Sequence, residues 1–182
     1  MSIQRLERTR EHPVPAPPKR AWVTLLVLGM LLPLGAILLT VALGVTGGAA
    51  AFSAAAAVST AITLTLLGLM RRRSIRLEAG QLRVVAAFYH LRVPIADLDL
   101  ERSRAVDLAE HSELRPMLKT NGFALPGYSA GHFRLRNRSK AFCLVTDPAR
   151  VLALPRHDGG ILLLSPERPQ ALREALQAAH AG

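Results

Sequence analysis

The sequence predicts a membrane protein of the α+β class, in which a hairpin of two apolar helices precedes a small antiparallel β-sandwich or partly open barrel. Residues 21–70 contain no Asp, Glu, Lys, Arg or His. At about 1.5 Å per helical residue, this stretch could cross a hydrocarbon core of roughly 30 Å twice. Residues 71–164 show short alternating runs separated by turn residues, as strands do. Residues 165–180 have helical periodicity, which predicts a C-terminal helix capping the sheet.

Composition limits the classes of function. The chain has 182 residues, of which half are hydrophobic and 4% aromatic, and a formal net charge of +10. Nucleic-acid binders of such charge usually interleave aromatic with basic residues, so we expect the charge to face anionic lipid and not nucleic acid. The single cysteine, Cys143, cannot form an intrachain disulfide, which fits a reducing compartment.

The first 20 residues form a basic tail with four closely spaced prolines. Such a composition cannot bury a core, so we expect residues 1–20 to be a disordered cytoplasmic tail.

The two predicted transmembrane helices cover residues 21–46 and 49–70. Pro33 predicts a kink in the first, with neighbouring groups satisfying the carbonyl that proline leaves free. The short connection between the helices makes them antiparallel neighbours. A signal peptide is the main alternative, but the apolar stretch far exceeds an h-region of about 7–15 residues. Small residues at a spacing of four predict the helix–helix contact at Ala49, Ser53, Ala57, Ala61 and Thr65.

Orientation follows from the charges that flank this hairpin. Both outer ends are basic and the connection between the helices is uncharged, so the positive-inside rule places the tail and residues 71–182 together in the cytoplasm. The basic residues near the membrane would set this topology, and they could also attract anionic lipid. They are Lys19, Arg20, Arg71, Arg72, Arg73 and Arg76.

About seven short strands are predicted in residues 71–182, the cytoplasmic domain. We expect strands within residues 74–77, 81–87, 88–93, 98–103, 128–135, 140–146, 151–154 and 161–164. Glu78, Ala79 and Gly80 predict the first hairpin turn. The terminal helix begins near Pro169. Its apolar stripe consists of Leu172, Ala175, Leu176 and Ala179.

Prolines, glycines and an asparagine interrupt any pattern over residues 110–127. We expect a long irregular connection with one helical turn near residues 112–118, which either binds a ligand or folds over the barrel. The candidate binding loop contains Asn121, Gly122, Gly127 and Tyr128.

Several short motifs, in their order and spacing, carry a family resemblance. They include Thr120-Asn121-Gly122, Pro126-Gly127-Tyr128, Leu154-Pro155 and the run of residues 162–166. Residues 71–180 resemble the bacterial pleckstrin-homology (PH)-like domain family in its membrane-anchored form. The resemblance implies a seven-stranded PH fold with a C-terminal helix, no catalytic activity and a location in the bacterial cytoplasmic (inner) membrane. Phosphoinositide-binding PH domains carry basic residues around the first hairpin loop, whereas here that loop is short and acidic.

Motifs for catalysis or cofactors are not found in the sequence. No two of the six histidines have a close metal-ligand spacing, and the chain contains no G-x-S-x-G, Walker or G-x-G-x-x-G motif. We therefore expect no enzyme, metal or cofactor. A basic stripe at a spacing of two shares one sheet face, either solvated or in contact with lipid head groups or an acidic partner. It comprises His132, Arg134, Arg136 and Arg138, with Lys140 across the turn.

Together these features predict a non-enzymatic, two-pass membrane protein that presents a PH-like domain at the cytoplasmic membrane surface. The expected role is a protein-interaction or assembly module. The alternative is a module that senses anionic lipid through its basic strand face.

Overall fold

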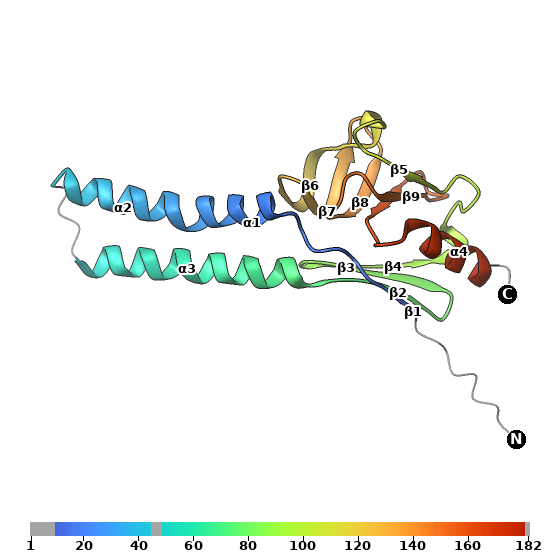
Figure 1. Cartoon of the computed structure of the whole chain (residues 1–182), viewed down its shortest axis with the longest axis horizontal. Helices are drawn as coiled ribbons and strands as arrows, with labels where there is room; N and C mark the ends of the chain where they lie inside the picture. Colours follow the sequence, from blue (N-terminus) through green and yellow to red (C-terminus); the bar gives the residue numbers. More distant parts are fainter. Residues whose placement is uncertain (1–9, 45–48, 181–182) are drawn as a thin grey trace, which may run out of the picture.

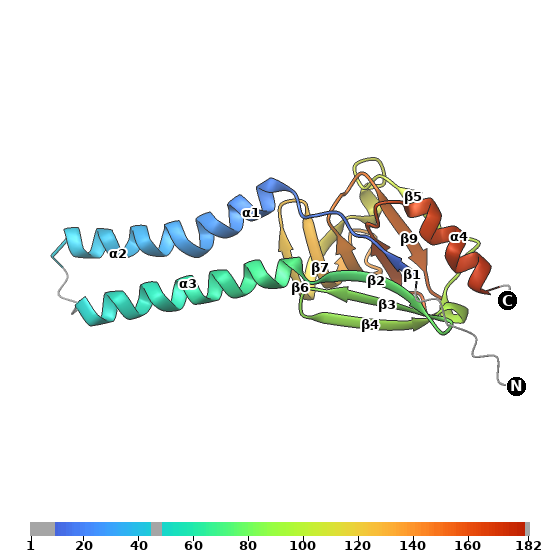
Figure 2. The same ribbon diagram turned by 60° about the horizontal axis from the view of Figure 1, so that its bottom comes forward.

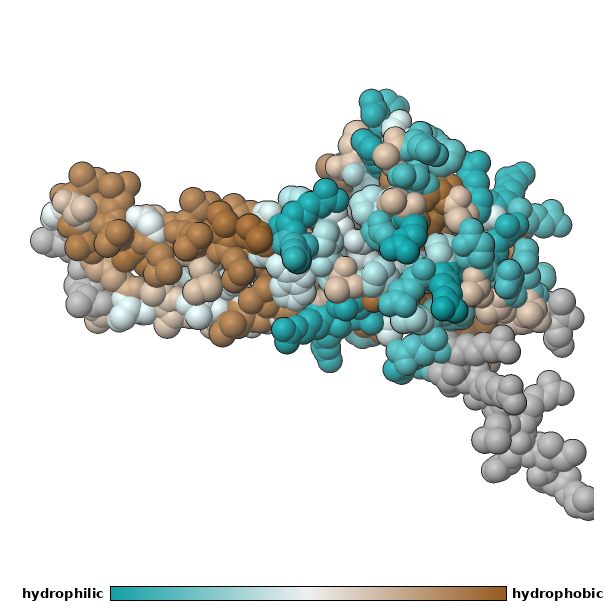
Figure 3. All heavy atoms as spheres, in the orientation of Figure 1, coloured by the Kyte–Doolittle hydropathy of each residue, from teal (hydrophilic) through white to brown (hydrophobic). Residues whose placement is uncertain are grey.

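The computed structural model describes residues 10–44 and 49–180. A long pair of antiparallel helices projects from one end of a domain made of two β-sheets and a C-terminal helix (Figure 1). The domain and the helix pair differ in surface character: on the face shown in Figure 3, the helices present mostly hydrophobic side chains and the domain mostly hydrophilic ones.

Both predicted apolar helices are present. The first is continuous from Lys19 to Ala42 and consists of α1 (Lys19–Leu26), the π-helical segment η1 (Val27–Leu31) and α2 (Leu32–Ala42). The second is α3 (Ala49–Arg71). Each is long and apolar enough to cross a membrane. The predicted turn at residues 46–48 lies outside the described residues.

A polar contact joins the two helices beside Pro33. Proline has no N–H for the carbonyl four residues earlier, which belongs to Gly29. The hydroxyl of Ser59 in α3 donates a hydrogen bond to this carbonyl, as the sequence predicted for a neighbouring group. Thr63, which is fully buried, packs so closely against Gly29 that a side chain there would collide with it. The absence of a side chain at Gly29 therefore permits the close approach of the helices.

The contact with the neighbouring helix was predicted on the wrong face of α3, the stripe of small residues. Ser53, Ala57, Ala61 and Thr65 are all exposed. A spacing of four residues advances about 40° around a helix at each step, so the stripe turns away from the neighbouring helix. The contact follows the face of Ser59 and Thr63 instead.

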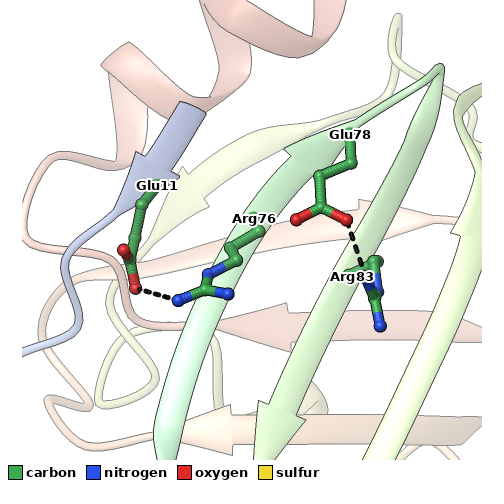
Figure 4. Close-up of polar contacts among 4 residues, drawn as sticks. All are labelled: Glu11, Arg76, Glu78 and Arg83. Atoms are coloured by element: carbon green, nitrogen blue, oxygen red, sulfur yellow. Dashed lines mark hydrogen bonds and ion pairs between the residues drawn. The ribbon is translucent and has the colours of Figure 1, made fainter. Parts of the chain in front are cut away.

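Residues 10–12 of the N-terminal tail form a strand where the sequence predicted a disordered tail over residues 1–20, and residues 1–9 of that tail lie outside the described residues. β1 (Arg10–His12) pairs antiparallel with β2 (Arg73–Glu78). A surface ion pair of 3.4 Å joins Glu11 to Arg76 across these strands (Figure 4). The tail thus adds an edge strand to the sheet, an interaction between distant segments that the composition of the tail could not indicate.

The four-stranded sheet has the order β1-β2-β3-β4, with β3 (Gln81–Ala86) and β4 (Tyr89–Pro94). The predicted first hairpin is confirmed. Its two-residue turn has positive φ at both Ala79 (48°) and Gly80 (72°), as a type I′ turn requires. Glu78 is paired with Arg83 at 2.7 Å on the same hairpin (Figure 4).

The six-stranded sheet has the order β5-β9-β10-β8-β7-β6. Its strands are β5 (Arg104–Val106), β6 (Pro116–Leu125), β7 (Tyr128–Leu135), β8 (Lys140–Val145), β9 (Val151–Pro155) and β10 (Ile161–Leu164). The β8–β10 pair is parallel, because β10 returns between β8 and β9. The fold therefore has two open sheets containing ten described strands, and the predicted all-antiparallel arrangement of seven strands was wrong in this respect.

Two stretches of the domain differ from the predicted elements. Residues 98–103 were expected to form a strand but contain only an isolated bridge at Leu98. Residues 116–125 were expected to be irregular but form the long strand β6, preceded by the short 3-10 helix η3 (Ser112–Leu114). Irregular pairing at two points between β6 and β7 disrupts the alternation by which strands are recognised in a sequence.

The hydrophobic core lies between the two sheets and under α4 (Pro169–His180). Leu172, Ala175 and Leu176 of the predicted stripe are buried there, whereas Ala179 is exposed. Successive residues of β10 belong to different cores: Leu162 packs between the sheets and Leu163 against the opposite face. Both faces of the six-stranded sheet are covered, which explains why its central strands are continuous apolar runs.

Candidate binding groove

A groove of about 610 Å³ opens where the two sheets part. Leu91 of β4 forms one wall, and Phe142 of β8 and Leu162 of β10 belong to the six-stranded sheet opposite. Four cationic side chains border this apolar surface: Arg134, Arg138, Lys140 and Arg156. The groove combines hydrophobic contact with converging positive charge, which suits an anionic ligand with an apolar part.

The β7–β8 hairpin supplies three of these cations. Arg134 pairs in register with Lys140, so both side chains lie on the same face as Phe142, two residues further along β8. The guanidinium of Arg134 donates a hydrogen bond to the Arg138 carbonyl at 3.4 Å. Arg138 has φ of 67° in the turn, and this conformation brings its side chain to the groove although β7 has already ended.

Four members of the predicted basic stripe line the groove and one does not. His132, Arg134, Arg138 and Lys140 are lining residues. Arg136 follows the end of β7 and is exposed outside the groove, where its backbone N–H bonds to the Arg115 carbonyl. The prediction placed Arg136 on the same face because side chains alternate between the two faces of a strand, but this alternation ends where β7 ends.

Arg156, which the sequence did not single out, comes from the β9–β10 turn. Its Nη1 forms an ion pair of 2.9 Å with Asp158, and its buried Nε has no hydrogen-bond partner in residues 10–44 and 49–180. Asp158 also accepts a hydrogen bond from the backbone of Gly160 and so is held in place. Among the described lining residues, Asp158 is the single acid, and it neutralises Arg156 alone.

Aromatic rings close one side of the groove. The His132 ring lies edge-on to Phe142, with centroids 5.1 Å apart, and to Tyr89 of β4 at 6.2 Å. The Tyr89 hydroxyl hydrogen-bonds to Asn121 of β6 at 3.1 Å. The bond between Tyr89 and Asn121 joins β4 and β6, which are edge strands of the two sheets.

The candidate binding loop is not a loop. Asn121 and Gly122 lie within β6, and Gly127 forms the β6–β7 turn beneath the guanidinium of Arg20. Tyr128 is only 1% exposed, in the core. A ligand on the surface therefore cannot contact these four residues as one site.

Two titratable groups in the core have perturbed pKa values. Burial raises the pKa of Tyr128 to about 12, although the positive charge of Arg73 acts in the opposite direction. Burial alone raises the pKa of the Cys143 thiol, which disfavours the reactive thiolate. Neither group reaches the groove.

The basic residues predicted to lie near the membrane fall into two groups. Lys19, Arg20, Arg71 and Arg72 are exposed at the domain ends of the two apolar helices. Arg73 instead donates hydrogen bonds at 3.2 Å to the carbonyls of Val14 and Met70, which joins the tail to the end of α3. Arg76 is held by its ion pair on the tail.

No cluster of three or more His, Cys, Asp or Glu residues that could hold a metal ion is found within the described residues. In the groove, four cationic side chains border an apolar surface, and such an arrangement suits recognition by charge and shape. Two packed, open sheets with a C-terminal helix across them define a PH-like domain, carried here on two apolar helices.

The chain belongs to the bacterial PH domain family. The family model described as Bacterial PH domain matches residues 73–180, which run from β2 to the end of α4. The resemblance detected in the sequence is thereby confirmed, and domains of this family are typically non-catalytic. Searches of curated proteins and of solved structures found no match to the chain.

Proposed function

We propose that this protein is a non-enzymatic, two-pass component of the bacterial cytoplasmic membrane that binds an acidic segment of a partner protein. The PH domain would stand at the cytoplasmic surface and take the segment into the groove between its sheets. One observation carries this proposal: Arg134, Arg138 and Lys140 converge on an apolar surface and form no ion pair within the described part of the chain.

The proposed orientation is supported by the charges at the helix ends. Lys19 and Arg20 precede the first helix, and Arg71 and Arg72 end the second. Positive residues are retained on the cytoplasmic side of membranes. The domain and the tail then share the cytoplasmic side, which agrees with the pairing of β1 on β2.

The groove lies near the end of the domain that carries the helices. His132, which lines the groove, has its ring 6.2 Å from that of Tyr89, and Tyr89 follows the β3–β4 turn beside the end of α3. We therefore expect the acidic segment to belong to a partner that lies in or at the same membrane.

Anionic lipid is the second candidate ligand. Arginine is well suited to phosphate, and Leu91, Phe142 and Leu162 would accommodate part of an acyl chain. This alternative predicts binding that depends on lipid composition and not on an acidic peptide.

The test uses the full chain in nanodiscs, because the isolated domain would lack β1. A fluorescent peptide of alternating glutamate and leucine is titrated against discs of neutral lipid, with the double variant Arg134→Gln/Lys140→Gln and the matched control Arg136→Gln. Each charge-assisted hydrogen bond contributes about 1.5–3 kcal/mol, so the double variant should weaken binding at least about tenfold. The control should bind as the wild type does, and added salt should weaken both.

Equal affinity of the double variant and the control would refute the proposed site. The lipid alternative would be established by a different result. The wild type would not bind the peptide but would retain phosphatidylglycerol on purification, and the double variant would lose this lipid.

A further inference from the structure

We infer that the β3–β4 turn forms a second contact with the bilayer, in which Phe88 inserts among the lipid head groups beside α3. The turn consists of Ala87 and Phe88, between β3 and β4. Phe88 is 52% exposed, although phenylalanine is usually buried in a water-soluble domain. This inference rests on the proposed crossing of the membrane by α3 and goes beyond the groove and its ligand.

The turn is fixed at the level of the helix end. The backbone N–H of Ala87 donates a hydrogen bond of 2.9 Å to the carbonyl of Arg72, the residue directly after α3. Arg73, the first residue of β2, pairs with Ala86, the last residue of β3. Figures 1 and 2 both show the β3–β4 turn next to the end of α3. If α3 enters the bilayer at Arg71, the Phe88 side chain therefore lies at the depth of the head groups.

The chemistry of this corner matches a membrane interface. Exposed Arg71 and Arg72 supply positive charge for lipid phosphates, and Phe88 supplies an aromatic ring. The Phe88 ring packs edge-on against Tyr89 at 6.4 Å, which orients it without covering it. The occupant of this exposed aromatic surface is then the bilayer that already holds the neighbouring helix.

A second turn anchors the other helix to the domain. The β6–β7 turn at Gly127 lies directly under the guanidinium of Arg20, in the first turn of α1. Each helix is thus attached to a β-turn at the same end of the domain (Figure 2). A rotation of the domain that moved Phe88 away from the lipid would also separate these two contacts.

Quenching of tryptophan fluorescence by brominated lipid tests the contact. Trp22 is the sole tryptophan, so the full chain with Trp22→Phe has no tryptophan fluorescence of its own. Single tryptophans are then introduced by Phe88→Trp, by Leu64→Trp in α3 and by Met117→Trp in β6. Leu64 is 61% exposed on the apolar helix, and Met117 is 68% exposed opposite the far end of β7.

Nanodiscs are made with lipids brominated near the head-group end of the acyl chains, or with the unbrominated equivalents. We expect Phe88→Trp to lose most of its emission in the brominated discs and to emit at shorter wavelength than Met117→Trp, which should keep its emission. Quenching of Leu64→Trp with no quenching of Phe88→Trp overturns the second contact. Absence of quenching at Leu64→Trp would instead contradict the membrane crossing that the proposed function requires.

Discussion

Replacing Tyr128 with Phe should stabilise the domain, and the gain should increase at high pH. The Tyr128 hydroxyl is buried and has no hydrogen-bond partner among the described residues. Its ring packs edge-on against Phe123, with centroids 6.0 Å apart. Phenylalanine preserves this packing and removes the polar atom. An unsatisfied buried group costs about 1–3 kcal/mol, so a gain of this order is expected at neutral pH.

The pH dependence follows from the pKa of Tyr128. Burial raises it to about 12 in the folded protein from a usual value of 10.0. The neutral phenol is therefore favoured in the folded state, and the wild type loses stability as the pH rises from 10 towards 12. At pH 11 the loss amounts to about 1.4 kcal/mol, the equivalent of one pKa unit. Tyr128→Phe has no phenol to ionise and avoids this loss.

The measurement is urea unfolding of the full chain in detergent micelles, followed by far-UV circular dichroism at neutral pH and near pH 11. The Cys143 thiol ionises over this pH range in the unfolded chain, because burial raises its pKa only in the folded protein, but it is present in both proteins and its contribution cancels in the difference. If Tyr128→Phe is less stable than the wild type at neutral pH, the claim that the Tyr128 hydroxyl lacks a hydrogen-bond partner is wrong. A difference between the proteins that stays constant up to pH 11 would contradict the raised pKa.

Three further predictions concern packing. Because burial raises the pKa of the Cys143 thiol, maleimide should label it at neutral pH only after urea unfolding; rapid labelling of the folded protein would show that the core opens. Gly29→Ala should lower the free energy of unfolding by about 1–3 kcal/mol in thermal denaturation, because the new side chain collides with Thr63. Adding Thr63→Ala should restore part of the lost stability. Gly131→Ala should cost about 1–3 kcal/mol or more in urea unfolding, because Gly131 has φ of 103° and a side chain would approach the Asn121 carbonyl to 2.8 Å; wild-type stability would exclude this strain.

Local patterns in the sequence predicted most elements of the fold. Strong helical periodicity identified α4, and the uncharged stretch identified both apolar helices. β6 was missed because its irregular pairing disrupts the alternation of exposed and buried positions. β1 has only three residues, and it exists because β2 offers an edge to pair with. The order of strands, including the parallel β8–β10 pair, depends on contacts between distant residues that no local pattern reports.

The candidate groove was predicted to the extent that it lies on one hairpin. Arg134 and Lys140 belong to adjacent strands, so their common face follows from strand geometry. Arg156 comes from a different hairpin, and only the return of β10 beside β8 brings it to the same groove. The apolar wall at Leu91 comes from the other sheet. The charge of the site was therefore visible in the sequence, but its depth and its hydrophobic surface were not.

The connections between domain and helices bear directly on how such a groove would work. Arg72 alone separates α3 from β2, so this side has no flexible linker. On the other side the tail pairs with β2, and the carbonyl of Pro13 accepts a hydrogen bond from the backbone of Glu167, near α4. The chain is thus held to the domain both where it approaches the first helix and where it leaves the second. These two connections oppose rotation of the domain about either helix, so the groove keeps one orientation relative to the two apolar helices. If the helices cross the bilayer as proposed, a partner in the same membrane meets a site that is already oriented, and less entropy is lost on binding than with a domain on a flexible tether.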